Sequence, residues 1–139
     1  MDERIVKFLK KMHLASVCTI DDDGQPYAFS AFYAFDEINF CLLLASSNES
    51  SHVKFLKNSK LVAGTVALDT KIVGKIEGVQ FQGAMSEASE SEREIYFKRF
   101  FYAKAMDPKI WSISLEKVKF TSNTLGFGKK IKWERGDKI

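Results

Sequence analysis

The residues in the chain best suited to hold an anion are the six polar residues SSNESS, which separate an apolar run from a short basic segment. Residues 41–45 are typical of a buried strand, and residues 52–57 of a short helix that opens with His52 and carries Lys54. A helix start presents free backbone N–H groups and a positive dipole end, and serine hydroxyls add donors. This chemistry suits a phosphate monoester. A simple helix cap, in which Ser46 acts with Glu49 or Asn48 alone, is the alternative.

A planar ring attached to that phosphate would need a stacking surface and hydrogen-bond partners for its edge. The segment SAFYAF offers adjacent aromatic residues, and GVQFQG places Gln80 and Gln82 on one face of a strand. Trp111 or Trp133 could supply a stack. Aromatic residues of strands more commonly belong to the core, and we expect this of Phe29 and Phe35.

Other catalytic signatures are missing from the sequence. It has no GxSxG nucleophile elbow, no HExxH pair and no Walker motif, and GFGKK at residues 126–130 lacks the spacing and hydroxyl of a phosphate loop. Its two cysteines and two histidines are not at zinc-knuckle spacing, so we expect no metal site and two buried free thiols, Cys18 and Cys41. If the protein is an enzyme, a cofactor should carry the difficult step.

Composition indicates a folded protein, with 45% hydrophobic and 13% aromatic residues among 139, and the length suits one domain spanning residues 1–139. No apolar run approaches the about 20 residues that span a bilayer, and the N-terminus lacks the apolar segment of a secretory signal. We therefore expect a cytoplasmic protein with no membrane partner.

Positive charge gathers at the C-terminus, where residues 116–139 hold seven basic and three acidic residues in a chain of net charge +3. Such a tail suits an anionic ligand, and an ordinary solvated surface explains it equally well. Nucleic acid is not favoured as a partner, because the lysines of the tail are not interleaved with exposed aromatic residues and no recognition motif is present.

The elements that must position these residues are mainly strands. Asp2 should cap a first helix that ends near Met12 or His13. Ser89 with Glu92 should form a capping box for a second helix over residues 89–106, with an aromatic, core-facing stripe. Alternation predicts strands at residues 14–20, 27–36, 38–46, 60–68, 76–88 and 111–122, the last with a slip near Glu116. Hairpin connections dominate, and Asp23-Gly24 is the strongest of them. About six antiparallel strands favour a small closed or split barrel, because closure removes exposed edges.

The order of these segments resembles a known family. SAFYAFD, an apolar strand leading into a serine loop and a helix, then AGTV, GVQFQG and above all FTSNTLGFGKKIKW are similar to the YhbP-like proteins. That family is assigned to the pyridoxamine 5'-phosphate oxidase-like, FMN-binding split-barrel superfamily. The resemblance extends over residues 5–133.

The resemblance implies a mainly β protein with a six-stranded antiparallel Greek-key split barrel, acting as a homodimer with FMN sites at the subunit interface. Ser46, Ser51 and His52 match the places that hold the FMN phosphate, although the family pattern has Lys or Arg where this chain has His52. An ordinary histidine is largely neutral at pH 7, so phosphate retention should weaken as pH rises.

We therefore expect a flavin-dependent oxidoreductase of unknown substrate. The alternative is a non-catalytic module that binds flavin, haem or another phosphorylated ligand in the same cleft. The phosphate would be held by Ser46, Ser47, Ser51, His52 and Lys54. The ring would be lined by Ser30, Ala31, Phe32 and Gln82, with Trp111, Lys129 and Lys130 as further candidates that a partner subunit would donate.

Overall fold

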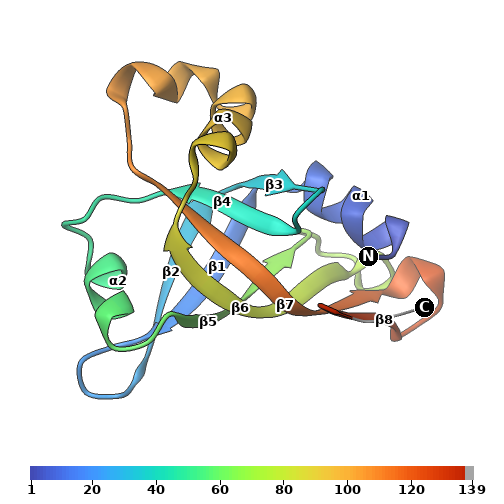
Figure 1. The fold of residues 1–139 in the computed structure, drawn as a ribbon. Coiled ribbons are helices and arrows are strands. Elements are labelled where there is room, and N and C mark those ends of the chain that lie inside the picture. The colour runs from blue at the N-terminus through green and yellow to red at the C-terminus, as the bar shows by residue number, and fades with distance from the viewer. Residues whose placement is uncertain (137–139) are drawn as a thin grey trace.

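The computed structural model describes residues 1–136. Its strands are β1 (Leu14–Ile20), β2 (Pro26–Phe32), β3 (Ala34–Asp36), β4 (Cys41–Ala45), β5 (Leu61–Ala67), β6 (Glu77–Glu87), β7 (Ile110–Ser122) and β8 (Lys129–Glu134). All neighbours are antiparallel, in the order β2-β1-β5-β6-β7-β4-β3, with β8 paired to β7. The sheet curls into a half-barrel that brings β2 close to β4 (Figure 1).

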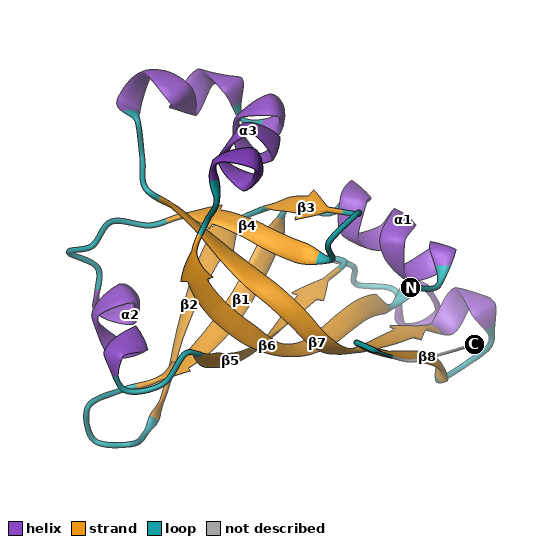
Figure 2. Ribbon diagram, in the orientation of Figure 1, coloured by secondary structure: helices purple, strands orange, loops and turns teal. Residues whose placement is uncertain are grey.

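Three α-helices and four 3-10 segments surround this sheet (Figure 2). The helices are α1 (Glu3–Lys11), α2 (Ser51–Lys54) and α3 (Glu90–Arg99), and the 3-10 segments are η1 (Phe55–Lys57), η2 (Val73–Lys75), η3 (Phe101–Met106) and η4 (Asn123–Leu125). The longest helix has ten residues, and none among the described residues is long and apolar enough to cross a membrane.

Both predicted helix caps are confirmed. Asp2 accepts a hydrogen bond from the backbone N–H of Arg4 at 2.8 Å. Ser89 and Glu92 form a reciprocal capping box, each side chain accepting from the other residue's backbone N–H. Because these bonds satisfy donors that a helix start leaves free, they fix where α1 and α3 begin.

The expected number of strands was wrong, since the sheet has eight rather than six. The segment predicted as one strand at residues 27–36 is interrupted at Tyr33, whose hydroxyl is buried and donates to the carbonyl of Leu9 at 2.7 Å. That break turns the chain from β2 to β3. β8 is the second addition, and the turn before it contains Gly126 and Gly128, both with positive φ.

The main core fills the concave side of the sheet. It comprises Ile5, Phe8 and Leu9 of α1 together with the inward residues of β1, β4, β5, β6 and β7. A second cluster packs Tyr96 and Phe97 of α3 on the opposite face of β4. β4 is therefore covered on both sides, as its uninterrupted apolar sequence predicts, and four of its five residues are buried.

The expected slip in the last long strand is confirmed as a bulge. Gln82 of β6 pairs with Lys117 and the next residue, Gly83, pairs with Leu115, so Glu116 is the extra residue. At Gly83 a Cβ would lie 2.3 Å from the carbonyl oxygen of Ser114, which leaves room for glycine alone.

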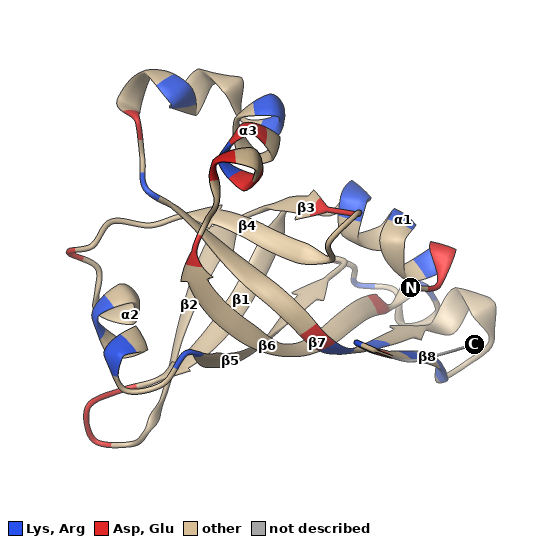
Figure 3. Ribbon diagram, viewed as in Figure 1, with Lys and Arg blue, Asp and Glu red and all other residues tan. Residues whose placement is uncertain are grey.

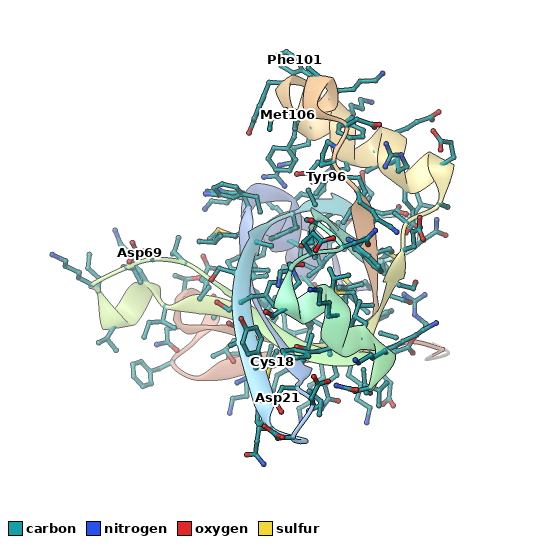
Figure 4. All side chains as sticks on the ribbon, turned by 90° about the vertical axis from the view of Figure 1, so that its left-hand side faces the viewer. Cys18, Asp21, Asp69, Tyr96, Phe101 and Met106 are labelled. Atoms are coloured by element: carbon teal, nitrogen blue, oxygen red, sulfur yellow. The ribbon has the colours of Figure 1, made fainter. Side chains whose placement is uncertain are left out.

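The aromatic stripe after Ser89 is only partly a core element. Tyr96 and Phe97 are buried, whereas Phe101 and Met106 are 76% and 85% exposed. The helix ends at Arg99 and the chain continues as η3, which leaves the sheet (Figure 4). The helical period is lost there, so the later apolar residues of the stripe do not reach the core.

Candidate functional site

The serine loop and His52 meet in one corner, where β4 ends and α2 begins. The Nε2 atom of His52 lies 2.8 Å from Oγ of Ser46 and 3.3 Å from Oγ of Ser50. Ser50 in turn donates to the carbonyl of Ser47 at 2.6 Å. Three polar groups thus converge on one point, and we call Ser46, Ser47, Ser50 and His52 the His52 corner.

The ring of His52 is held by β2. It stacks on Phe29 with ring centroids 3.7 Å apart and planes 9° apart. Burial in this position lowers the pKa of His52 below its ordinary value. Without an anion beside it, the imidazole is therefore largely neutral at pH 7, as the ordinary pKa of histidine led us to expect.

Trp111 forms one wall of the corner from β7. Its indole N–H donates to the backbone carbonyl of Ser46 at 3.0 Å, and the ammonium of Lys109 lies 5.1 Å from its ring centroid. The backbone N–H of Ser46 donates to the carbonyl of Lys109. Trp111 thus reaches the corner from the same protomer, and this position requires no partner subunit.

A cavity of about 560 Å³ opens beside the corner, lined by residues 45–49 and 107–109. Its charged side chains are Glu49, Asp107 and Lys109. Lys54 does not line the cavity, and it forms a long, exposed ion pair of 4.0 Å with the lining residue Glu49. The donors therefore suit a phosphate, while the two carboxylates limit how strongly an anion is attracted.

The helix-cap interpretation of the serine loop receives no support. The N-cap of α2 is Ser50, not Ser46, and its side chain makes no capping hydrogen bond. Ser51 is exposed at the first helical position. The Ser46 hydroxyl lies against Nε2 of His52 instead, and the Ser50 hydroxyl donates to the Ser47 carbonyl while lying 3.3 Å from the same nitrogen. The Ser47 hydroxyl accepts from the backbone N–H of Glu49, which is a local turn contact within the loop.

The predicted ring residues lie apart from one another. Ser30 and Phe32 are exposed on the convex face of the sheet, while Ala31 points the other way and packs on the core. Gln82 is exposed on the same convex face, but β1 and β5 lie between its strand and β2. Lys129 and Lys130 pair with Ser122 and Thr121 at the far end of β7. Within one protomer these residues do not form a single pocket.

Ser50 of the corner and two residues beside it, Phe29 and Lys109, were absent from the sequence-based list of site residues. Phe29 was expected to be core, and it does pack on the core, but its ring also carries His52. The alternation of β2 could have predicted that Phe29 faces inward, since Phe29 and Ala31 lie on the same face of the strand. Cys18, expected to be buried, is only partly covered, whereas Cys41 is buried as predicted.

Comparison with proteins of similar sequence shows the family to which this chain belongs. Over 135 residues the chain is 37% identical to UPF0306 protein YhbP of Salmonella paratyphi A, covering 94% of this chain and 91% of that protein. The chain belongs to the UPF0306 YhbP family. No protein-family model matches it.

Solved structures similar to this YhbP-family chain share its fold. A haem-binding protein from Mycobacterium smegmatis superposes with a TM-score of 0.72 at 14% identity, covering 88% of this chain and 53% of that one. An FAD-binding protein from Mesorhizobium loti superposes with a TM-score of 0.70 at 15% identity, covering 86% and 93%. These likenesses place the YhbP-family chain in the split-barrel class.

Proposed function

We propose that this protein is a homodimeric FMN-binding split barrel whose flavin phosphate sits in the His52 corner. The observation that carries the proposal is the convergence of the Ser46 and Ser50 hydroxyls on Nε2 of His52, within 3.3 Å. These groups now bond to one another, and each can exchange that partner for a phosphate oxygen. The split-barrel neighbours that bind FAD or haem support a ligand of this size.

The donor set fits a phosphate ester. Ser46, Ser47, Ser50 and Ser51 offer hydroxyls, and His52 becomes a cation when a dianion lies beside it. Lys109 adds positive charge in the cavity lining, and Lys54 adds it next to the lining residue Glu49. A bound flavin would supply the hydride chemistry for an oxidoreductase, and the protein would supply binding and orientation.

The convex face of the sheet supports the homodimer. Residues 14–20, 26–32, 61–67 and 78–86 contain no Lys, Arg, Asp or Glu, although charged residues make up 28% of the chain. Figure 3 shows β1 and β2 without charged residues along their length.

We call the outward residues of β1, β2, β5 and β6 the bare face. It exposes large apolar side chains, with Phe32 55% and Leu61 69% exposed. Depletion of charge marks the core of protein interfaces, and a second copy would cover this face.

Pairing two bare faces would also complete the flavin site. Ser30 of β2 and Gln82 of β6 are separated by about 14 Å along the sheet, which is three strand spacings of about 4.8 Å. In a two-fold interface each contact occurs twice, so β2 of one protomer can lie against β6, β7 and β8 of the other. The predicted ring residues would then come from both subunits.

A second candidate is a haem-binding module. It is favoured by the lowered pKa of His52, because the neutral imidazole is the form that coordinates iron. The absorption spectrum separates the two candidates: flavin bands support the proposal, and a Soret band after addition of haem, lost in His52→Ala, supports the alternative.

The decisive experiment compares FMN with riboflavin, which lacks the phosphate. We expect FMN to bind at least about tenfold more tightly, a difference of about 1.4 kcal/mol. His52→Ala should narrow that difference, whereas Ser91→Ala, on the exposed start of α3, should leave it unchanged. Equal affinities for FMN and riboflavin would mean that this corner does not bind the phosphate.

A second experiment asks whether the bound flavin turns over. Reduction of bound FMN by a nicotinamide nucleotide would support an oxidoreductase, and binding without reduction would support a carrier.

A further inference from the structure

A second cavity lies on the convex side of the sheet, away from the His52 corner. It has a volume of about 660 Å³ and is formed where β1, β5, β6, β7 and β8 run side by side. Its lining includes Lys117, Lys119 and Lys132 from β7 and β8, and Gln80 and Gln82 from β6. We call it the lysine trough. Figure 3 shows the basic residues of β8 and the adjoining part of β7 at this place.

The pairing of β7 with β8 leaves uncompensated charge in the trough. Lys119 is the direct partner of Lys132 in the register. Like charges directly opposite each other destabilise a sheet. Among residues 1–136, no carboxylate lies within ion-pair distance of either ammonium, whereas Lys117 is paired with Glu134 at 3.8 Å. An anion bound between Lys119 and Lys132 would relieve this repulsion.

Neutral donors lie next to the two cations. The register places Thr65, Gln80 and Lys119 in one row across β5, β6 and β7, and Ala63, Gln82 and Lys117 in the next row. Within the described part of the chain, no hydrogen bond engages the side chains of Thr65, Gln80 or Gln82. A hydroxyl, two amides and two ammonium groups are therefore available to the same ligand.

We propose that the lysine trough binds a small polyanion that carries two or more carboxylate or phosphate groups. The volume is that of a small-molecule site. Lysines act as point charges without the planar selectivity of arginine, so either anionic group is compatible. The trough is finite, because its floor on β5 and β6 belongs to the bare face, which holds no cation that could extend a track for a nucleic-acid backbone. Trp133 is only partly exposed and packs against Phe40, so it offers no free platform for bases. The trough shares the outward residues of β5 and β6 with the bare face, so in the proposed dimer it would lie at the subunit interface, and Gln82 is also a predicted ring residue. The anion is therefore tested on the flavin-free protein.

The test is calorimetric titration of the flavin-free protein with inorganic pyrophosphate, citrate and orthophosphate. We expect pyrophosphate or citrate to bind at least about tenfold more tightly than orthophosphate, because two charges are met at once. Lys119→Gln and Lys132→Gln should each weaken that binding by about tenfold. Lys104→Gln, on the exposed η3 segment, should leave it unchanged. Tighter binding of pyrophosphate would indicate a ligand with phosphate groups, and tighter binding of citrate a ligand with carboxylate groups.

A second readout guards against variants that fold poorly. Lys132→Gln removes the like-charge pair, so its melting temperature should equal or exceed that of the parent, and pyrophosphate should no longer raise it. The proposal is overturned if no polyanion binds, if His52→Ala abolishes binding while Lys119→Gln does not, or if a single-stranded oligonucleotide binds more tightly than any of the small anions.

Discussion

The imidazole of His52 lies flat on the phenyl ring of Phe29, 3.7 Å between centroids, while its Nε2 atom faces the hydroxyl of Ser46 at 2.8 Å. One face of the ring is thus removed from water, and one nitrogen is kept among neutral hydroxyls. This arrangement makes His52 a group that is neutral at rest and can be charged by an incoming anion.

The protonation of His52 should respond to Phe29. In an NMR titration we expect His52 to have a pKa below about 6.5, its ordinary value. Phe29→Leu exposes the imidazole ring of His52 to water and should raise the pKa of His52 toward its ordinary value. A His13→Gln variant assigns the remaining imidazole signal to His52. No change in Phe29→Leu would mean that the stack does not set the pKa.

The same shift predicts how stability depends on pH. The unfolded chain takes up the His52 proton at a higher pH than the folded chain does, so the free energy of unfolding should fall as pH drops below about 6.5. In His52→Gln this component should disappear. Urea unfolding of both proteins across that pH range measures it, and parallel curves for the two proteins would refute the prediction.

FMN affinity should have the opposite pH dependence. Because phosphate binding favours the charged imidazole, affinity should rise as pH falls through the pKa of His52. His52→Lys is charged throughout and should show a flatter profile. The phosphate itself titrates near about pH 6 in both proteins, so the comparison isolates the side chain. The same slope in both proteins would place the phosphate elsewhere.

The bare face should control the oligomeric state. Ala63→Lys places a charge at its centre and should convert a dimer into a monomer in light-scattering measurements. Ile38→Lys is the matched control, since Ile38 is 80% exposed in the turn before β4, outside the bare face. A dimer that persists in Ala63→Lys would show that a different surface pairs the subunits.

Gly83 should tolerate no side chain. The added methyl of Gly83→Ala would meet the backbone oxygen of Ser114, which cannot turn away, so we expect a loss of about 1–3 kcal/mol in the free energy of unfolding. Gly74→Ala has open space around it and should be close to neutral. Thermal and urea unfolding of the pair check this difference.

The hydroxyl of Tyr33 should matter to stability because it connects the strand break to α1. Tyr33→Phe removes the buried hydrogen bond to Leu9 and should cost about 1 kcal/mol. Tyr27→Phe is the control, because Tyr27 is 38% exposed and its ring only contacts Phe55. Equal stability of the two variants would mean that this bond contributes nothing.

Local chemistry in the sequence predicted the elements well. The caps at Asp2 and Ser89, the hairpin at Asp23-Gly24 and the slip at Glu116 each depend on a few adjacent residues, and all are present. The break at Tyr33 was missed because its cause is a hydrogen bond to α1, which is distant in sequence. The end of α3 at Arg99 was missed because aromatic residues continue beyond it.

The site was predictable only where it is continuous in sequence. Ser46 follows β4 and His52 lies in the first turn of α2, six residues later, so their meeting follows from the short loop between β4 and α2. Phe29 and Trp111 reach the same corner from β2 and β7. Their positions depend on the pairing of distant strands, which local sequence patterns do not predict. The ring residues depend on contacts between distant strands, and in our proposal on a second protomer, so spacing along the chain could not group them.

The extra residue Glu116 has a consequence for how this chain can vary in length. Before it, Ile113 and Leu115 face the core; after it, Val118 and Phe120 do. If Glu116 were accommodated in a regular strand, the phase of everything downstream would reverse and Lys117 and Lys119 would turn toward the interior; the bulge absorbs the extra residue and keeps both lysines outside. Loss of Glu116 together with the bulge would leave Leu115 and Val118 on the same face, two positions apart, whereas one further inserted residue would break the pattern. Homologues should therefore have either the present spacing between Leu115 and Val118 with a bulge, or a spacing one residue shorter without one.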